Sequence, residues 1–361
     1  MNLASFGYRL DIENILQKDN LSYKELARVI RQDKDRYIII HQRGYLEGIP
    51  TGNLLFASPD QGSLPVVGDW VAVTLMEQGA DEKLDGQAII HRVLERRNAF
   101  ERKSSGQKTD RQVLAANLDA AIIIQAAGHE LNVRRLERYL SGLGDQDIRV
   151  ALVINKIDLL EKKEAENLKE RIHRLFPQLK VFYMSCKYRT GVDALRAYLE
   201  PARTYGFLGS SGVGKSTLLN LLAGGEVQKT QDISHHTSKG KHTTTHRELF
   251  PLPNGALVID TPGMREFGMT ADSHTEAVFP EIQRMADHCQ FADCRHEHEP
   301  GCAVLKAVEA GDIDRQQYES YLKLRREQEH YARSEAEKRQ RGKDFGKMQK
   351  EVKRFKNKWK G

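Results

Sequence analysis

The sequence has no long apolar run, no recognisable export signal and few cysteines. No apolar run approaches the ~18 residues of a membrane-spanning helix, so we expect no membrane association. The N-terminal residues MNLASFGYRLDIENIL lack a basic stretch followed by an apolar one, which argues against a secretory signal. Four cysteines in 361 residues are too few for a disulfide framework. Together these absences favour a protein of the reducing cytoplasm.

Excess positive charge is also absent from most of the chain, although the net charge is +6. Residues 331–361 hold 12 Lys/Arg and 4 Asp/Glu, whereas residues 1–330 hold 44 and 46. The basic character therefore lies in a tail, where Phe345, Phe355 and Trp359 stand among the basic residues. Basic and aromatic residues together favour RNA binding, and a solvated, disordered end is the alternative.

Short segments rich in β-forming residues occupy residues 35–100. Turn-forming Gly, Pro, Asn and Asp separate Tyr37–Ile40, Trp70–Val73 and Ala88–Ile90. This spacing predicts a small barrel of the OB type, with another small β domain as the alternative. Residues 1–34 show no clear pattern and are treated as an N-terminal extension, and the polar residues 98–112 are expected to be a linker.

Apolar runs alternate with amphipathic segments over residues 112–275. Strands are expected at 120–125, 150–154, 181–184, 205–208 and 256–259, and helices at 133–143, 159–175, 192–199 and from residue 215. Short buried strands alternating with helices are typical of a parallel sheet covered on both faces. The region is therefore predicted to be an α/β domain.

Residues 209–216 fit the pattern G-x-x-x-x-G-K-S between a predicted strand and a predicted helix. In such a phosphate-binding loop, glycines let backbone N–H groups surround a phosphate, and the helix N-terminus adds a favourable dipole. Lys215 is expected to reach the β- and γ-phosphates and Ser216 to bind Mg²⁺. The predicted loop contacts are Gly209, Ser210, Ser211, Gly212, Val213, Gly214, Lys215, Ser216 and Thr217.

Two further segments can recognise guanine. The first, Asn155-Lys156-Ile157-Asp158, ends a predicted strand; its carboxylate can accept two hydrogen bonds from guanine that adenine does not offer. The second, Ser185-Cys186-Lys187, follows the next strand, where a backbone N–H can meet guanine O6. The Ser185-Cys186-Lys187 segment is weak evidence by itself. The alternative interpretation of the N-K-x-D segment is the solvated start of a helix.

Asp260-Thr261-Pro262-Gly263 follows the predicted strand 256–259. After a phosphate-binding loop, Asp260 is expected to hold Mg²⁺ through water and the Gly263 amide to meet the γ-phosphate. Residues 243–245 are threonines, one of whose hydroxyls would complete the magnesium shell, with Thr244 as the candidate. A solvated polar loop is the alternative for that segment.

The order of these motifs is unusual. In ordinary GTPases the phosphate-binding loop comes first, whereas here the N-K-x-D and S-C-K segments precede it. The sequence therefore predicts a circularly permuted domain, an arrangement that is feasible when native termini lie close together.

Four candidate metal ligands lie within residues 278–330: Cys289, Cys294, His296 and Cys302. Their spacing, C-x4-C-x-H-x5-C, is typical of a closed tetrahedral zinc site with a structural role. Such a site can order a small helical domain. His288 and His298 are alternative ligands, and buried free thiols are the alternative interpretation. Cys186 lies apart and is expected to pack as a small apolar residue.

Together these motifs resemble a known family. The segments GSSGVGKST, K-H-T-T-T and D-T-P-G-M-R-E-F, the permuted order and C-x4-C-x-H-x5-C-A-V are similar to those of the ribosome small subunit-dependent GTPase A (RsgA) family. The resemblance covers about residues 35–330 and includes Val67-Gly-Asp-Trp70-Val and Asn117-Leu-Asp119.

The resemblance implies a circularly permuted P-loop GTPase domain of α/β class over residues 112–275. An N-terminal OB-type barrel (35–100), a C-terminal helical zinc-binding domain (278–330) and the basic tail (331–361) complete the expected organisation. It also implies that GTP is hydrolysed to GDP and phosphate, stimulated by the small ribosomal subunit and its rRNA during late maturation. We expect a monomer with one zinc ion, and with Mg²⁺ bound alongside GTP.

Met264 directly follows D-T-P-G, where many GTPases have a water-orienting glutamine. Methionine cannot position water by hydrogen bonding, and the resemblance points to His242 as its replacement. The catalytic candidates are therefore Lys215, His242 and Thr244. The alternative function is an RNA-binding assembly or placeholder protein in which nucleotide only tunes affinity.

Overall fold

The computed structural model of the chain describes residues 2–22, 25–33, 36–56, 64–76, 86–103, 111–128, 131–143, 147–225, 247–260 and 275–330. The chain forms two compact units. The first comprises Met1–Arg102, Arg111–Leu136 and Asp145–Glu266, and the second comprises Lys103–Asp110, Glu137–Gly144 and Phe267–Gly361. Across the described ranges, every helix is too short or too polar to span a membrane.

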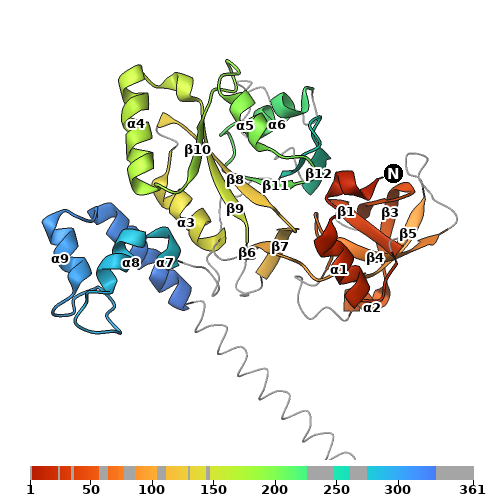
Figure 1. Ribbon diagram of the computed structural model, residues 1–361, viewed down its shortest axis with the longest axis horizontal. Coiled ribbons are helices and arrows are strands. Elements are labelled where there is room, and N and C mark those ends of the chain that lie inside the picture. The colour runs from red at the N-terminus through yellow and green to blue at the C-terminus, as the bar shows by residue number, and fades with distance from the viewer. Residues whose placement is uncertain are drawn as a thin grey trace, which may run out of the picture. The chain divides into compact units, whose positions relative to one another are not determined.

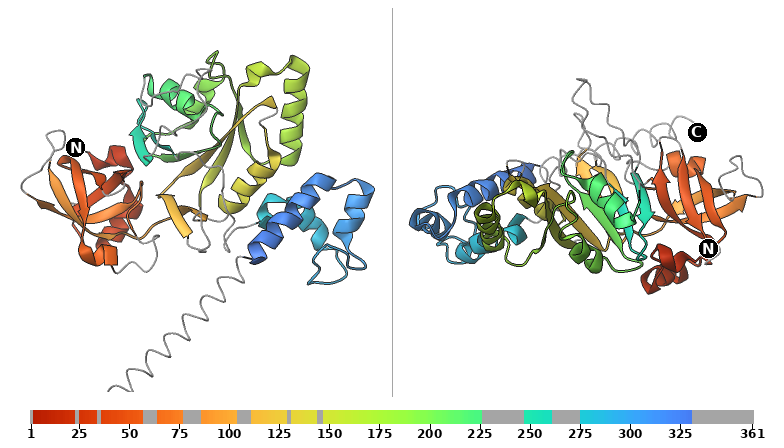
Figure 2. Two further views of the ribbon diagram at one scale, coloured as in Figure 1. Left: turned by 180° about the vertical axis from the view of Figure 1, so that it is seen from behind. Right: turned by 90° about the horizontal axis from the view of Figure 1, so that it is seen from above.

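Five strands near the N-terminus close into a barrel, seen in Figures 1 and 2: β1 (Leu26–Gln32), β2 (Tyr37–His41), β3 (Gly44–Pro50), β4 (Trp70–Met76) and β5 (Gln87–Val93). The order β1-β2-β3-β5-β4 returns to β1 because β4 also pairs with β1. Val29, Ile39 and Ile90 are among the side chains that fill the interior. This closure confirms the predicted barrel.

The first barrel strand, β1, lies within residues 1–34, a segment whose sequence shows no clear pattern. It follows the 3₁₀ helix η1 (Leu3–Phe6) and the helix α1 (Leu10–Lys18), and the short helix α2 (Gly52–Phe56) follows β3. Part of the extension therefore belongs to the barrel wall, because β1 pairs with both β2 and β4.

The linker predicted over residues 98–112 is wrong for part of its length. β6 (Ala99–Lys103) and β7 (Arg111–Ala116) instead form a two-stranded sheet. Phe100 is buried, and Ala99 packs against the buried Val66 and Val113. The burial of these apolar side chains outweighs the polar composition of the surrounding residues.

The predicted α/β region forms a sheet in which β10 (Lys180–Tyr183), β9 (Arg149–Asn155), β8 (Ala120–Ala126), β11 (Thr204–Leu208) and β13 (Leu257–Asp260) lie parallel in that order. The strands and helices predicted from periodicity are confirmed. The sheet departs from a purely parallel one at its edge, where β12 (Arg247–Pro251) is antiparallel to β13.

Helices connect these strands: α3 (Val133–Leu143), the 3₁₀ helix η5 (Ile157–Leu159), α4 (Lys162–Leu175), α5 (Val192–Tyr198) and α6 (Lys215–Ala223). Helices α5 and α6 lie side by side in Figure 1. Leu195 and Leu218 from these helices share one apolar core with Ile122, Val153 and Phe207 of the strands. Alternating strand residues therefore bury one face of the sheet beneath α5 and α6.

A buried arginine joins the barrel to the central sheet. Arg28, on β1, is fully buried and donates hydrogen bonds to Gly68 O (3.2 Å) and to Thr204 Oγ1 (3.0 Å) at the start of β11. It also donates to Phe6 O, which brings η1 into the same joint. Burial lowers the pKa of Arg28 to about 10. β1 in addition pairs with β12, so the barrel and the central sheet are hydrogen-bonded to each other.

The second unit is helical in the part that the structure describes. It contains α7 (Thr275–Val278), α8 (Pro280–Ala286), α9 (Ala303–Ala310) and a helix over residues 315–330. Phe279 and Tyr321 meet edge to face at 5.6 Å between ring centroids, and Ile282 and Val304 are buried. Its apolar core is small, consistent with a need for a further stabilising feature.

Candidate nucleotide and metal sites

The carboxyl ends of the parallel strands bring the predicted nucleotide motifs to one edge of the sheet. Asn155 is the last residue of β9, Ser185 follows β10, Gly209 follows β11 and Asp260 ends β13. Residues 155 and 209 are far apart in the sequence, yet parallel strands carry them to the same side. This edge of an open α/β sheet is where ligands usually bind.

Three glycines shape the phosphate-binding loop. Gly209, Gly212 and Gly214 have φ angles of 155°, 84° and 98°, in the region that favours glycine. A Cβ on Gly209 would lie 2.3 Å from Ile124 O, and a Cβ on Gly214 would lie 2.3 Å from Asn155 Nδ2. The loop therefore needs glycine for close approach as well as for backbone conformation.

Lys215 opens α6 and points back across the loop. Its Nζ donates to Gly209 O (2.7 Å) and Ser210 O (2.9 Å), so two of its three N–H groups are held and one is left to reach a phosphate. The side chain is buried. Burial lowers the pKa of Lys215, while the negative charge of Asp260 acts in the opposite direction.

Asn155 ties the phosphate-binding loop to the S-C-K segment. Its Nδ2 donates to Val213 O (2.8 Å), and its Oδ1 accepts from Cys186 N (3.0 Å). Both polar atoms of the side chain are thus engaged with loop backbone. Asp158 lies on η5, and its side chain is exposed. Lys156, the residue before η5, has a left-handed φ of 60°.

The S-C-K segment forms a short turn. Ser185 pairs with Thr190 through two backbone hydrogen bonds, and Ser185 Oγ accepts from Tyr188 N (3.3 Å). Cys186 is buried in the apolar core, as predicted, and burial raises the pKa of its thiol to about 11. Lys187 is exposed.

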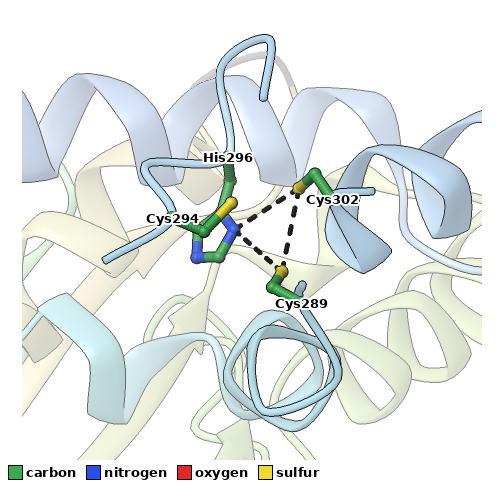
Figure 3. A group of neighbouring side chains, drawn as sticks. All are labelled: Cys289, Cys294, His296 and Cys302. Atoms are coloured by element: carbon green, nitrogen blue, oxygen red, sulfur yellow. Dashed lines mark hydrogen bonds between the residues drawn. The ribbon is translucent and has the colours of Figure 1, made fainter. Parts of the chain in front are cut away.

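The four predicted metal ligands come together in the second unit, and Figure 3 shows their side chains converging. Their ligand atoms all lie within 4.8 Å of one another. His296 Nδ1 is 3.5 Å from both Cys289 Sγ and Cys302 Sγ, and those sulfurs are 3.9 Å apart. Tetrahedral zinc–sulfur bonds place two sulfurs about 3.8 Å apart, so this set fits a zinc ion. His288 and His298 are not members of the cluster.

The backbone around the cluster also supports it. Cys302 is the N-cap residue of α9, and its Sγ accepts a hydrogen bond from Leu305 N (3.4 Å), which fixes this sulfur at the start of the helix. His296 has a left-handed φ of 59°, and its carbonyl accepts a hydrogen bond from Tyr318 Oη. Burial lowers the pKa of His296, which favours the neutral imidazole that binds metal.

Several predicted site residues lie outside the described residues: His242, Thr244, Gly263, Met264 and the tail 331–361. Two other polar residues were missed from the sequence. Arg135 donates to Ser210 Oγ in the phosphate-binding loop, and Arg28 joins the barrel to β11. Neither arginine belongs to a recognisable sequence motif, so the role of each can be found only from the folded structure.

The fold and the nucleotide edge define a circularly permuted P-loop GTPase. The family model described as RsgA GTPase matches residues 93–270. A small ribosomal subunit biogenesis GTPase RsgA of Opitutus terrae is 42% identical over 85% of this chain and 84% of its own length. RsgA 1 of Bacteroides thetaiotaomicron is 39% identical over 98% of both.

The chain belongs to the RsgA GTPase family. Among solved structures, that of YjeQ from Thermotoga maritima has a TM-score of 0.61 and 25% identity, covering 83% of this chain and 96% of its own. YloQ, titled a circularly permuted GTPase, has a TM-score of 0.58 and 23% identity, covering 86% and 95%. The latter supports the permuted fold, and the fold prediction is confirmed.

Proposed function

We propose that this chain is a GTP hydrolase that acts, as a cytoplasmic monomer, in biogenesis of the small ribosomal subunit. One observation carries the nucleotide assignment: the guanine-reading motif and the phosphate-binding loop meet at one sheet edge and are tied together through Asn155. The curated relatives that cover most of the chain are named for small-subunit biogenesis, which supports the choice of partner. The barrel, the second unit and the basic tail are the proposed rRNA-binding parts.

We assign each motif residue the following role. Asp158 accepts hydrogen bonds from guanine, and the backbone of residues 209–217 together with Lys215 surrounds the phosphates. Ser216 and Asp260 are the residues that would hold Mg²⁺, which neutralises phosphate charge when bound. The Gly263 amide is assigned to the γ-phosphate. The remaining proposed contacts are Asn155, Lys156, Ile157, Ser185, Cys186 and Lys187.

Hydrolysis by the free protein is expected to be slow, because Met264 cannot orient water. We assign that task to His242 and a second magnesium contact to Thr244, both brought into position when the small subunit binds. The test compares hydrolysis of GTP and ATP with and without purified small subunits. GTP turnover should rise at least about tenfold with subunits, and ATP turnover should not. An unchanged GTP rate would contradict the proposal.

Replacement of Lys215 separates this proposal from the placeholder alternative. Lys215→Ala removes the ammonium held beside the phosphates, so nucleotide binding and nucleotide-dependent release from the subunit should both be lost. If the variant still binds and leaves the subunit like the wild type, nucleotide merely tunes affinity and the alternative holds.

The Cys289–Cys302 cluster is proposed to hold one structural zinc ion. Its four ligands leave no open position for a reacting water, so zinc would stabilise the second unit. Cys294→Ser should lower the zinc content from about one ion per chain to none and increase hydrogen exchange over residues 275–330. Cys186→Ser is the control, because Cys186 lies outside the cluster, and it should keep its zinc. Full protection of residues 275–330 in the zinc-free variant would contradict a structural role.

A further inference from the structure

The connection from β8 to α3 lies beside the phosphate-binding loop. Strands β8 and β11 pair in parallel, with Ile123 opposite Leu208, so the segments that follow them leave the sheet at the same edge. Helix α3 follows β8, and the loop follows β11. Arg135, on the first turn of α3, therefore meets Ser210 of the loop, although 75 positions separate the two residues.

Asn132 fixes the start of α3 to the sheet. Gln125, buried near the end of β8, donates from Nε2 to Asn132 O (3.2 Å) and accepts at Oε1 from Asn132 N (2.8 Å). Asn132 Oδ1 accepts from Arg135 N (2.9 Å), and Asn132 O accepts from Leu136 N (3.1 Å), so Asn132 caps the helix. All of these residues belong to the first compact unit. The backbone of Arg135 is therefore held in a fixed place relative to β8.

The guanidinium of Arg135 contacts the second residue of the phosphate-binding loop. Its Nη1 donates to Ser210 Oγ, while Ser210 O accepts from Lys215 Nζ at 2.9 Å. Two positive charges therefore lie against one loop residue, where they repel each other at short range. Burial lowers the pKa of Lys215, and Asp260 supplies the negative charge that opposes this shift. Lys215 thus has a carboxylate that compensates part of its charge.

Arg135 has no carboxylate partner within the ranges that the structure describes. There, its guanidinium donates to Ser210 Oγ alone, and its side chain is half-buried. A guanidinium carries five N–H donors in a planar fork that matches the oxygens of a phosphate. Most of these donors are therefore left for a ligand, beside a loop whose glycines bring backbone N–H groups together. A half-buried cation in this place fits an anionic ligand better than a neutral one.

We propose that Arg135 is a second cation of the phosphate site, in addition to Lys215. It holds Ser210 through the hydrogen bond to Oγ, and its positive charge stabilises the phosphates of bound GDP and GTP. This role rests on the nucleotide binding proposed for the loop. Two consequences separate it from a purely structural role: the contribution of Arg135 to affinity depends on its charge, and that contribution weakens as salt screens the charge.

The test is titration of the full chain with a fluorescent GDP at about 50 mM and at about 1 M salt, between which the Debye length falls from more than about 10 Å to about 3 Å. Arg135→Gln keeps an N–H donor for Ser210 but removes the charge, so its dissociation constant should rise about tenfold at the lower salt concentration. At the higher concentration the difference from the wild type should shrink to about threefold or less. Arg135→Lys keeps the charge and should bind GDP within about threefold of the wild type.

Arg134→Gln is the matched control, since it makes the same charge change one position earlier on α3. The side chain of Arg134 is exposed, and adjacent residues of a helix point in different directions. This variant should bind GDP with the wild-type affinity. Ser210→Ala is a second comparison, because it removes the hydrogen-bond acceptor and leaves the charge of Arg135 in place. Its dissociation constant should rise less than that of Arg135→Gln. Thermal melting establishes that each variant is folded.

Three results would overturn the role of Arg135 as a second cation: wild-type affinity of Arg135→Gln at the lower salt concentration, a loss of affinity in Arg135→Lys as large as in Arg135→Gln, or an equally large loss in Ser210→Ala. A wild-type chain that binds no GDP would instead contradict the proposed function. The two failures are therefore distinguishable.

Discussion

Asn155 directs both of its polar atoms toward the protein backbone, to Val213 O and Cys186 N. Its place in an N-K-x-D segment indicates a nucleotide motif, but this joining role is visible only in the folded chain. Asp158, the carboxylate that we propose recognises the base, is exposed.

Asp158→Ala should abolish the preference for GTP over ATP and leave stability unchanged. A carboxylate that accepts two hydrogen bonds from guanine can discriminate by about 10⁴-fold, and alanine accepts none. Competition of ATP and GTP against a fluorescent GDP measures the effect. Asp193→Ala, an exposed carboxylate on α5, is the charge-matched control and should keep the preference. Retention of strong GTP preference by Asp158→Ala would argue against its role.

The Cys186 thiol should resist alkylation in the folded protein. Burial disfavours the thiolate and raises the pKa to about 11 from an ordinary 9.0. At pH 8 the thiolate population should therefore be about 100-fold smaller than for an ordinary cysteine, and the rate should rise about tenfold per pH unit. Mass spectrometry after iodoacetamide treatment measures the rate, and the urea-unfolded chain serves as the control. Rapid native labelling at pH 8 would contradict this burial.

At the scale of elements, the two glycines that flank α6 have similar backbone conformations but different surroundings. Gly214 and Gly224 flank the helix with φ angles of 98° and 72°. A Cβ on Gly214 would meet Asn155 Nδ2 at 2.3 Å, whereas a Cβ on Gly224 would meet nothing within 4 Å. The sequence predicts where this helix starts, but the close approach at Gly214 comes from β9.

Gly214→Ala should therefore lower nucleotide affinity more than tenfold, because the added methyl group displaces Asn155 and the loop that it holds. Gly224→Ala is the matched control, for which only left-handed strain of about 1 kcal/mol is expected and nucleotide affinity should be unchanged. Fluorescent GDP titration and thermal melting measure the two effects. Equal affinities in the two variants would show that the contact with Asn155 is unimportant.

At the scale of the whole molecule, a buried polar network joins the start of α1, the barrel and the central sheet. Asp119, at the start of β8, accepts from Arg9 (2.9 Å), Arg97 (3.1 Å) and Arg203 (3.2 Å), and from Thr204 N (2.8 Å). Burial acts to raise the pKa of Asp119, but the Thr204 N–H and the arginines outweigh it and lower the pKa. The network gives residues 1–34 a structural role.

Arg28→Met should destabilise this joint by about 3 kcal/mol, because it removes the buried hydrogen bonds to Phe6 O, Gly68 O and Thr204 Oγ1. Urea unfolding followed by tryptophan fluorescence is a direct measurement, since Trp70 lies 5.3 Å from the Arg28 guanidinium. Arg31→Met, on the same strand, removes a partly exposed pair with Asp33 (2.9 Å) and should cost less than about 1 kcal/mol. A loss no greater than that of Arg31→Met would show that the joint is unimportant.

The motifs could be predicted from the sequence because their chemistry is local. The glycines of residues 209–214, the N-K-x-D segment and the four metal ligands each lie within a short stretch, and apolar periodicity indicates the strands that carry them. The strands β1, β3, β6, β7 and β12 were not predicted, since their apolar residues form short groups that polar residues and glycine interrupt.

Tertiary structure decided which distant residues meet. Arg28 and Thr204 are 176 positions apart, and Arg135 and Ser210 are 75 apart, yet each pair shares a hydrogen bond. A lone arginine has no periodicity or spacing that identifies its partner. Its role depends on strand order and helix placement, which arise from burial of the whole apolar core rather than from any single stretch of sequence.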